Sequence, residues 1–140
     1  MVQKKQEKYD RAYLEMAKIW GQLSYCERKK VGALIVKDRM IISDGYNGTP
    51  SGFENICEDD EGYTKWYVLH AEANAIVQAA KNGIQINQSE IYVTASPCYD
   101  CFKLIANAGI TVIYYDEFYR DKRIIEKSKE IGITSASLED

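Results

Sequence analysis

His70 is the only histidine in the chain, and it lies two residues before Glu72. Further along, Pro97 precedes Cys98, and Cys101 follows three residues later. A catalytic zinc ion commonly has three protein ligands and one solvent position, and a histidine with two thiolates is an established set. A carboxylate beside the metal, without binding it, can take a proton from the activated water and return it to a leaving group. The spacing therefore predicts a zinc site at His70, Cys98 and Cys101, with Glu72 as the catalytic proton shuttle.

The two cysteines are spaced to lie on one face of the first turn of a predicted helix. There the helix dipole and the unpaired backbone N–H groups favour the thiolate form. The pattern H-x-E…P-C-x-x-C is typical of zinc-dependent nucleobase deaminases. Taken singly, His70 reads as a polar group at a helix start and the cysteines as small core residues. A purely structural zinc would need a fourth ligand, for which only Cys26 and Cys57 remain.

The elements that position these residues follow from periodicity and from breaker residues. A loop rich in Gly, Pro, Ser and Asn separates an early hairpin, whose turn is Lys37-Asp38-Arg39, from the histidine. The expected helices are at 8–23, 70–81, 97–109 and 119–131, and the expected strands are at 31–36, 40–46, 89–96, 110–117 and 133–137. Since strands alternate with helices after the hairpin, we predict an α/β fold with a mixed five-stranded sheet and helices on both faces.

Composition limits the class of protein. The 140 residues are the size of one domain, so 1–140 is predicted to be a single domain. The longest apolar run, at 31–36, is far shorter than the ~20 residues that span a bilayer, and no secretory signal is visible, so we expect a cytoplasmic protein without a membrane partner. The net charge of −3, without a basic block, argues against a polynucleotide partner.

With these residues in place, nearly the whole chain resembles the deoxycytidylate (dCMP) deaminase family of the cytidine deaminase-like superfamily. The zinc motif indicates only the superfamily, whereas the GYNGTP loop and the segment around Arg28 narrow the resemblance to the nucleotide branch. The similar stretches are SYCERKKVGALIVKD at 24–38, GYNGTPSGF at 45–53, HAEANAI at 70–76, PCYDCFKLIANAGI at 97–110, and Tyr119 in YYDEFYRD. The resemblance implies a three-layer α/β/α fold and hydrolysis of dCMP to dUMP and ammonia, which supplies dUMP for thymidylate synthesis.

The resemblance also implies a set of substrate-binding residues. It assigns Arg28, Asn47 and Tyr119 to the substrate phosphate, with Ser24 and Ala71 as further candidates. An arginine can hold a phosphate through two parallel donors, so a net acidic protein can still bind a nucleotide. Without the resemblance, Arg28 reads as part of a solvated charge run, and Asn47 as a residue in a left-handed turn.

Regulation is a second implication of the resemblance. In many members of the family dCTP activates and dTTP inhibits, with Mg²⁺ bridging the phosphates, and the enzyme is often a homohexamer. The candidate regulatory residues here are in the glycine-rich loop, which offers backbone N–H groups to phosphate: Gly45, Tyr46, Asn47 and Gly48.

Cys26 and Cys57 match cysteines that bind a second, structural zinc in some phage members of the family. That ligand set includes a position two residues before the catalytic histidine, which is Val68 in this chain. We therefore expect Cys26 and Cys57 to be reduced core thiols, with a disulfide less expected in the cytosol.

Other functions stay open at this point. A bifunctional dCMP/dCTP deaminase would share the same motifs, and a tRNA or single-stranded DNA deaminase would share the zinc chemistry but need a basic channel with aromatic side chains. A nucleotide sensor that has lost catalysis would be expected to lack Glu72 or a ligand. A dithiol redox protein using Cys98 and Cys101 would be distinguished by its metal content.

Overall fold

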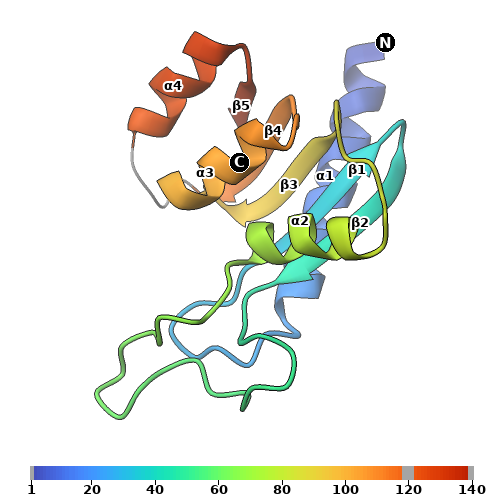
Figure 1. Ribbon diagram of the computed structural model, residues 1–140. Helices are drawn as coiled ribbons and strands as arrows, with labels where there is room; N and C mark the ends of the chain where they lie inside the picture. The colour runs from blue at the N-terminus through green and yellow to red at the C-terminus, as the bar shows by residue number, and fades with distance from the viewer. Residues whose placement is uncertain (1, 118–121, 139–140) are drawn as a thin grey trace.

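The computed structural model describes residues 2–117 and 122–138. This part of the chain contains four helices and five strands: one helix and a two-stranded hairpin come first, and helices and strands alternate after them (Figure 1). In chain order they are α1 (Val2–Gly21), β1 (Gly32–Lys37), β2 (Met40–Tyr46), α2 (Ala71–Lys81), β3 (Glu90–Ala95), α3 (Tyr99–Asn107), β4 (Val112–Glu117), α4 (Arg123–Ile131) and β5 (Thr134–Ser137).

The five strands form one mixed sheet in the order β2-β1-β3-β4-β5. β1 pairs antiparallel with β2 and with β3, where Ala33 lies opposite Val93. The β3, β4 and β5 strands are parallel, and each crossover between them contains a helix. The predicted mixed five-stranded sheet is therefore confirmed.

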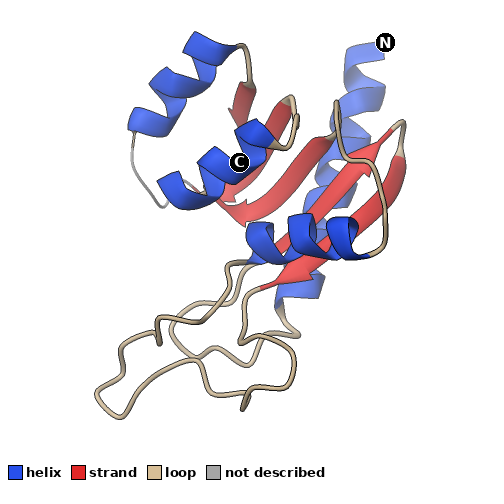
Figure 2. Cartoon of the chain, viewed as in Figure 1, coloured by secondary structure: helices blue, strands red, loops and turns tan. Residues whose placement is uncertain are grey.

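Helices cover both faces of the sheet, which confirms the three-layer prediction (Figure 2). On one face α1 packs through Tyr13 and Ala17 against Leu34, Val36 and Tyr92. On the other face, residues of α2, α3 and α4 share a core with inward-facing strand residues. This core includes Ala71, Ala75, Phe102, Ile105, Ile124, Ala33, Ile35, Ile91, Val93 and Ile113. Alternate residues of the central strands thus serve opposite faces, as strand geometry requires.

Most element boundaries differ from the sequence predictions by one or two residues, and two differences, at the start of α1 and in the hairpin turn, have physical reasons. α1 begins at Val2, whereas the apolar periodicity predicted a start at residue 8. The periodicity missed the first turns of the helix because they are charged and carry no apolar stripe. The hairpin turn has two residues rather than three, so Lys37 belongs to β1. Asp38 and Arg39 both have positive φ, which matches the strand twist of a tight two-residue hairpin.

The two helices that carry the predicted site residues, α2 and α3, start on the same side of the sheet, where β2 and β3 end. α2 packs closely on β2 because Gly45 has no side chain: a Cβ there would lie 2.5 Å from the Ala71 carbonyl oxygen. The long segment 47–69 and the shorter segment 22–31 both project beyond this side of the sheet (Figure 1). Within the described residues, no helix combines the length and apolar character needed to cross a lipid bilayer.

Candidate active site

The predicted zinc ligands come together at the N-termini of two neighbouring helices. His70 is the N-cap of α2, and Cys98 is the N-cap of α3 in the extended conformation that follows Pro97. Cys101 lies one turn into α3. His70 Nδ1 is 3.4 Å from the Sγ of Cys98 and 3.4 Å from the Sγ of Cys101.

These separations fit a tetrahedral zinc ion. Zn–S bonds of about 2.3 Å and a Zn–N bond of about 2.0–2.1 Å at tetrahedral angles place N and S about 3.5 Å apart. The donor set of one imidazole and two thiols also suits zinc, and three protein ligands leave one coordination position for solvent. His70, Cys98 and Cys101 are thus able to hold catalytic zinc.

The cluster is arranged to supply thiolate. Hydrogen bonds from Cys101 and His70 lower the pKa of Cys98 to about 3. The Cys98 sulfur also accepts from the backbone N–H of Cys101, at 3.5 Å, as an N-cap. The pKa of Cys101 is raised because it donates to Cys98, is buried and lies near the negative charge of Glu72. A cation bound between the sulfurs would displace that remaining proton.

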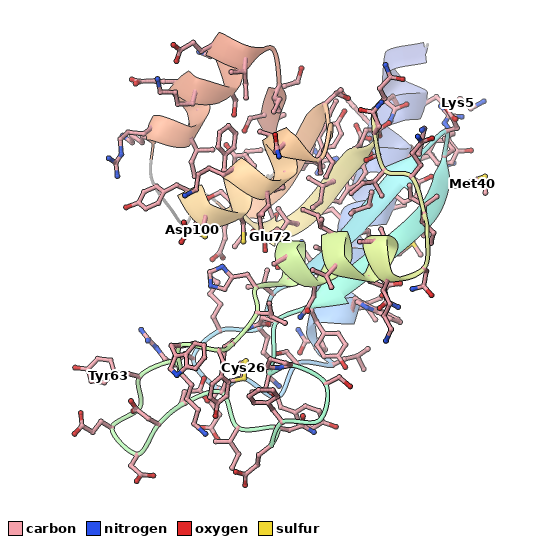
Figure 3. All side chains as sticks on the ribbon, in the orientation of Figure 1. Lys5, Cys26, Met40, Tyr63, Glu72 and Asp100 are labelled. Carbon is pink, nitrogen blue, oxygen red and sulfur yellow. A yellow bond between two sulfur atoms is a disulfide. The ribbon has the colours of Figure 1, made fainter. Side chains whose placement is uncertain are left out.

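Glu72 is the second residue of α2 and is buried, with 4% of its surface exposed. It lines one cavity together with His70 and Cys98, and its negative charge raises the pKa of Cys101. Figure 3 shows it at the end of α2 that faces α3. A carboxylate at this place lies where a proton shuttle is needed, while the three nearby donors are sufficient for the metal.

A cavity of about 340 Å³ opens over this cluster. Its lining includes His70 and the buried Glu72 at the start of α2, and the cations Arg28 and Lys29 of segment 22–31. Its volume is in the range of small-molecule sites. The remaining lining residues are Cys26, Val31, Asn47, Glu58, Thr64, Val68, Ala71, Ala95, Ser96 and Cys98.

Three of the predicted substrate-binding residues line this cavity. Arg28 is exposed, and its Nη1 donates to Thr64 Oγ1 at 3.5 Å. Ala71 places the first turn of α2 at the cavity wall. The amide of Asn47 fixes the cavity wall, since its Oδ1 accepts from Val31 N at 2.9 Å and its Nδ2 donates to the Lys29 carbonyl at 2.7 Å.

The structure separates the remaining substrate-binding candidates from the cavity or leaves them undescribed. Ser24 is buried behind the wall, where its hydroxyl donates to the Asn47 carbonyl at 2.7 Å and accepts from Cys26 N at 3.1 Å. Ser24 is therefore placed to support Asn47. Asn47 has no positive φ, so the left-handed turn is wrong as an explanation of its presence. Tyr119 lies outside the described residues.

The candidate regulatory residues lie at the end of β2. Gly45 is buried under α2, and the Tyr46 carbonyl accepts from Asn74 Nδ2 at 2.8 Å. Gly48 exchanges two backbone hydrogen bonds with Leu69, at 3.0 and 2.8 Å. The structure thus gives Gly45, Tyr46 and Gly48 contacts that hold α2 and the residue before His70.

The prediction that Cys26 and Cys57 are reduced thiols is wrong in this structure, where a disulfide joins them. Both residues are buried, and their Cα atoms are 5.1 Å apart. The long segment 47–69 folds back so that residue 57 lies beside residue 26, although 31 positions separate them in sequence. Figure 3 shows Cys26 between the two projecting loops.

Eight lining residues were not predicted as site residues, and four of these carry a charged group or a hydroxyl: Lys29, Glu58, Thr64 and Ser96. The side chain of Lys29 forms an ion pair with Glu117 at the end of β4. The only feature of the sequence that could have indicated Lys29 as a cavity residue is its positive charge next to Arg28. Glu58 and Thr64 belong to a loop without periodicity, so the sequence carried no signal for their place beside the cavity.

Comparison with known proteins agrees with this site. Residues 4–117 match the family described as the cytidine and deoxycytidylate deaminase zinc-binding region. The chain is 36% identical over 121 residues to the deoxycytidylate deaminase of Mycobacterium phage D29, covering 76% of this chain and 93% of the phage protein. It is 33% identical over 137 residues to ComE operon protein 2 of Bacillus subtilis, covering 94% and 71%. The crystal structure of dCMP deaminase from the cyanophage S-TIM5, in complex with dCMP and dUMP, matches with a TM-score of 0.87 and 44% identity, covering 91% and 95%.

The three-layer fold, the histidine–cysteine cluster and the buried glutamate together define the class of zinc-dependent deaminases. Similarity extends well beyond the metal ligands, over most of this chain and of its relatives. The chain belongs to the deoxycytidylate (dCMP) deaminase family, within the cytidine and deoxycytidylate deaminase zinc-binding superfamily.

Proposed function

We propose that this chain hydrolyses dCMP to dUMP and ammonia and so supplies dUMP for thymidylate synthesis. The observation that carries the proposal is one cavity whose lining includes His70 and Cys98 of the metal-binding cluster, the buried carboxylate of Glu72 and the guanidinium of Arg28. The cytosine ring of one mononucleotide would lie at the end of the cavity beside His70 and Glu72, and its phosphate at the end beside Arg28. The names of the similar phage enzymes, and the dCMP and dUMP bound in the S-TIM5 structure, support the same substrate.

At the base end, His70, Cys98 and Cys101 would hold zinc, which lowers the pKa of water to about 7 and so supplies a nucleophile at neutral pH. The burial of Glu72 keeps bulk water from competing for its proton. Its carboxylate would accept one proton of the attacking water and deliver it to N3 of the cytosine ring. It would then transfer the second proton, from the hydroxyl group formed on C4, to the departing amine, which leaves as ammonia. Glu72 thus serves as base and then as acid.

At the phosphate end, Arg28 would bind the monophosphate through its guanidinium, whereas the charge of the neighbouring Lys29 is compensated by its ion pair with Glu117. Asn47 holds the backbone of Lys29 and Val31 in place and faces the same cavity. Ala71 offers the first turn of α2 to the nucleotide. Tyr119 remains a proposed phosphate ligand on the resemblance alone.

Arg28→Ala is expected to lower kcat/KM for dCMP by about 100-fold, since a charge-assisted double contact to phosphate is lost. Turnover of deoxycytidine, which has no phosphate, should change by less than about threefold on the same reasoning. The measurement is the ultraviolet assay of both substrates with wild type and variant.

Arg11→Ala is the matched control, because Arg11 is exposed on α1 and bonds the carbonyl of Leu138 at 3.3 Å, away from the lining residues. This variant should leave the ratio of kcat/KM for dCMP to kcat/KM for deoxycytidine unchanged. Equal losses on dCMP and deoxycytidine in the Arg28 variant would remove Arg28 from the phosphate site.

The proposal includes regulation by dCTP as activator and dTTP as inhibitor, with Mg²⁺ on their phosphates, in a homohexamer. The segment at 45–48 would carry the effect to the catalytic site, because its backbone bonds lead to Leu69, directly before His70. The N–H groups of Asn47 and Gly48 already donate to backbone carbonyls, so they are not the groups that would bind the nucleotide phosphates.

Exposed apolar side chains on the helical layer, including Val77 and Leu104, are compatible with contacts between chains. Addition of dCTP should raise the rate at low dCMP and dTTP should lower it, in a particle about six times 16.0 kDa by light scattering. Rates that respond to neither nucleotide would rule out this regulation.

A further inference from the structure

The loop that carries Arg28 is bound to a distant turn by three different contacts. The turn is segment 57–64, near the tip of the projecting loop. Cys57 forms the disulfide with Cys26. The Glu58 carboxylate accepts from the backbone N–H of Glu27, at 3.3 Å to Oε1 and 3.2 Å to Oε2, and from that of Arg28, at 3.3 Å to Oε2. Thr64 then accepts from the guanidinium itself.

Segment 57–64 is built to present Glu58 and Thr64 side by side. These two residues pair in an antiparallel bridge, and Lys65 N donates to the Cys57 carbonyl at 2.7 Å. Between them, Asp59 Oδ1 accepts from the backbone N–H groups of residues 61 and 63 at 3.0 and 2.9 Å. The turn therefore has its own hydrogen bonds, and the carboxylate of Glu58 is held in one place relative to the Arg28 loop.

The Glu58 contact differs in kind from the disulfide next to it. A disulfide fixes the position of the Cys26 Cα atom but leaves rotation about the bonds of the two following residues. Two consecutive N–H groups directed at one carboxylate fix the orientation of those peptide units, and with it the direction in which the Arg28 side chain leaves the backbone. Glu58 is partly buried and lines the same cavity as Arg28.

We infer that Glu58 is a positioning residue for substrate phosphate: by binding the backbone of residues 27 and 28, its carboxylate directs the Arg28 guanidinium into the cavity. This inference rests on the proposed function, because it needs Arg28 to bind the phosphate of dCMP. Glu58 itself carries a negative charge, so it acts through Arg28 and makes no favourable contact with the phosphate.

The test compares Glu58→Gln and Glu58→Ala with wild type on dCMP and on deoxycytidine. Glutamine keeps an acceptor oxygen but loses the charge, whereas alanine removes both contacts. We expect kcat/KM for dCMP to fall about tenfold in Glu58→Ala, mainly through KM, and by less in Glu58→Gln. Deoxycytidine turnover should stay within about twofold of wild type, since it does not use Arg28.

Glu61→Gln is the matched control, because Glu61 is an exposed residue of the same turn and its loss changes net charge by the same amount. It should leave both substrates unaffected. In an Arg28→Ala background, Glu58→Ala should lower dCMP turnover by less than about twofold more, as expected for two residues that act as a unit.

The outcomes separate this inference from the proposed function. Losses that multiply in the double variant, equal losses on both substrates, or wild-type KM in Glu58→Ala would overturn the role of Glu58. If Arg28→Ala itself fails to discriminate dCMP from deoxycytidine, the phosphate site is misassigned and the inference falls with it. A selective KM effect that disappears in the Arg28→Ala background would support it.

Discussion

Glu72→Ala is expected to lower kcat for dCMP by about 10²–10⁴-fold, the range for loss of a general acid–base group. The buried carboxylate lies beside the ligand cluster and lines the cavity, so its removal takes away the proton acceptor without removing a metal ligand. The variant should therefore still contain one zinc ion per chain. The measurement is kcat from the ultraviolet assay together with zinc content by elemental analysis of the same preparation.

Glu72→Gln is the companion variant, because the amide has the same shape and cannot accept the proton. It should lose activity to the same extent, which excludes a packing effect of the alanine. Near-normal turnover in either variant would contradict the assigned role. Loss of zinc in both would instead make Glu72 part of the metal site.

Cys98→Ala is expected to reduce zinc affinity by more than about 100-fold, because even outer contacts of a metal site contribute 10–100-fold. Cys98 has the lowered pKa of the pair, about 3, and also caps α3 through its sulfur, so the variant loses a ready thiolate and an N-cap. Deaminase activity should disappear with the metal. Zinc content after dialysis against a weak chelator, and residual activity, measure the effect.

The control is Cys26→Ser/Cys57→Ser, which removes the disulfide and leaves the cluster at His70 untouched. This double variant should keep one zinc per chain. Retention of stoichiometric zinc by Cys98→Ala, or loss of all zinc in the control, would show that the catalytic metal is not held at the predicted cluster.

The metal site could be predicted from the sequence because each ligand has a local marker. His70 precedes an alanine-rich helix, and Cys98 and Cys101 flank the start of another helix behind Pro97. Helix starts are recognisable from short segments. The sheet that brings the two helix starts together follows from the alternation of strands and helices. The fold and the metal-binding cluster could therefore both be predicted from the sequence.

The part of the cavity formed by the loops was harder to predict from the sequence, because it depends on contacts between residues that lie far apart in the chain. Glu58 and Thr64 contact residues 30 to 36 positions away, and segment 47–69 has no period that predicts where it returns. The Cys26–Cys57 disulfide was missed for the same reason, because it also joins residues far apart in the chain. The expectation of a reducing cytosol moreover favoured free thiols. Ser24 was placed in the site by resemblance, whereas its hydroxyl supports Asn47 from behind.

The most direct test of the central claim is to incubate purified, zinc-loaded protein with dCMP and to quantify dUMP and ammonia. The account predicts that both products form in equal amounts, that deoxycytidine and a cytosine-containing oligonucleotide react far more slowly, and that chelation of zinc stops the reaction. Absence of dUMP from protein that contains one zinc per chain would contradict the assignment of dCMP as the substrate of this site.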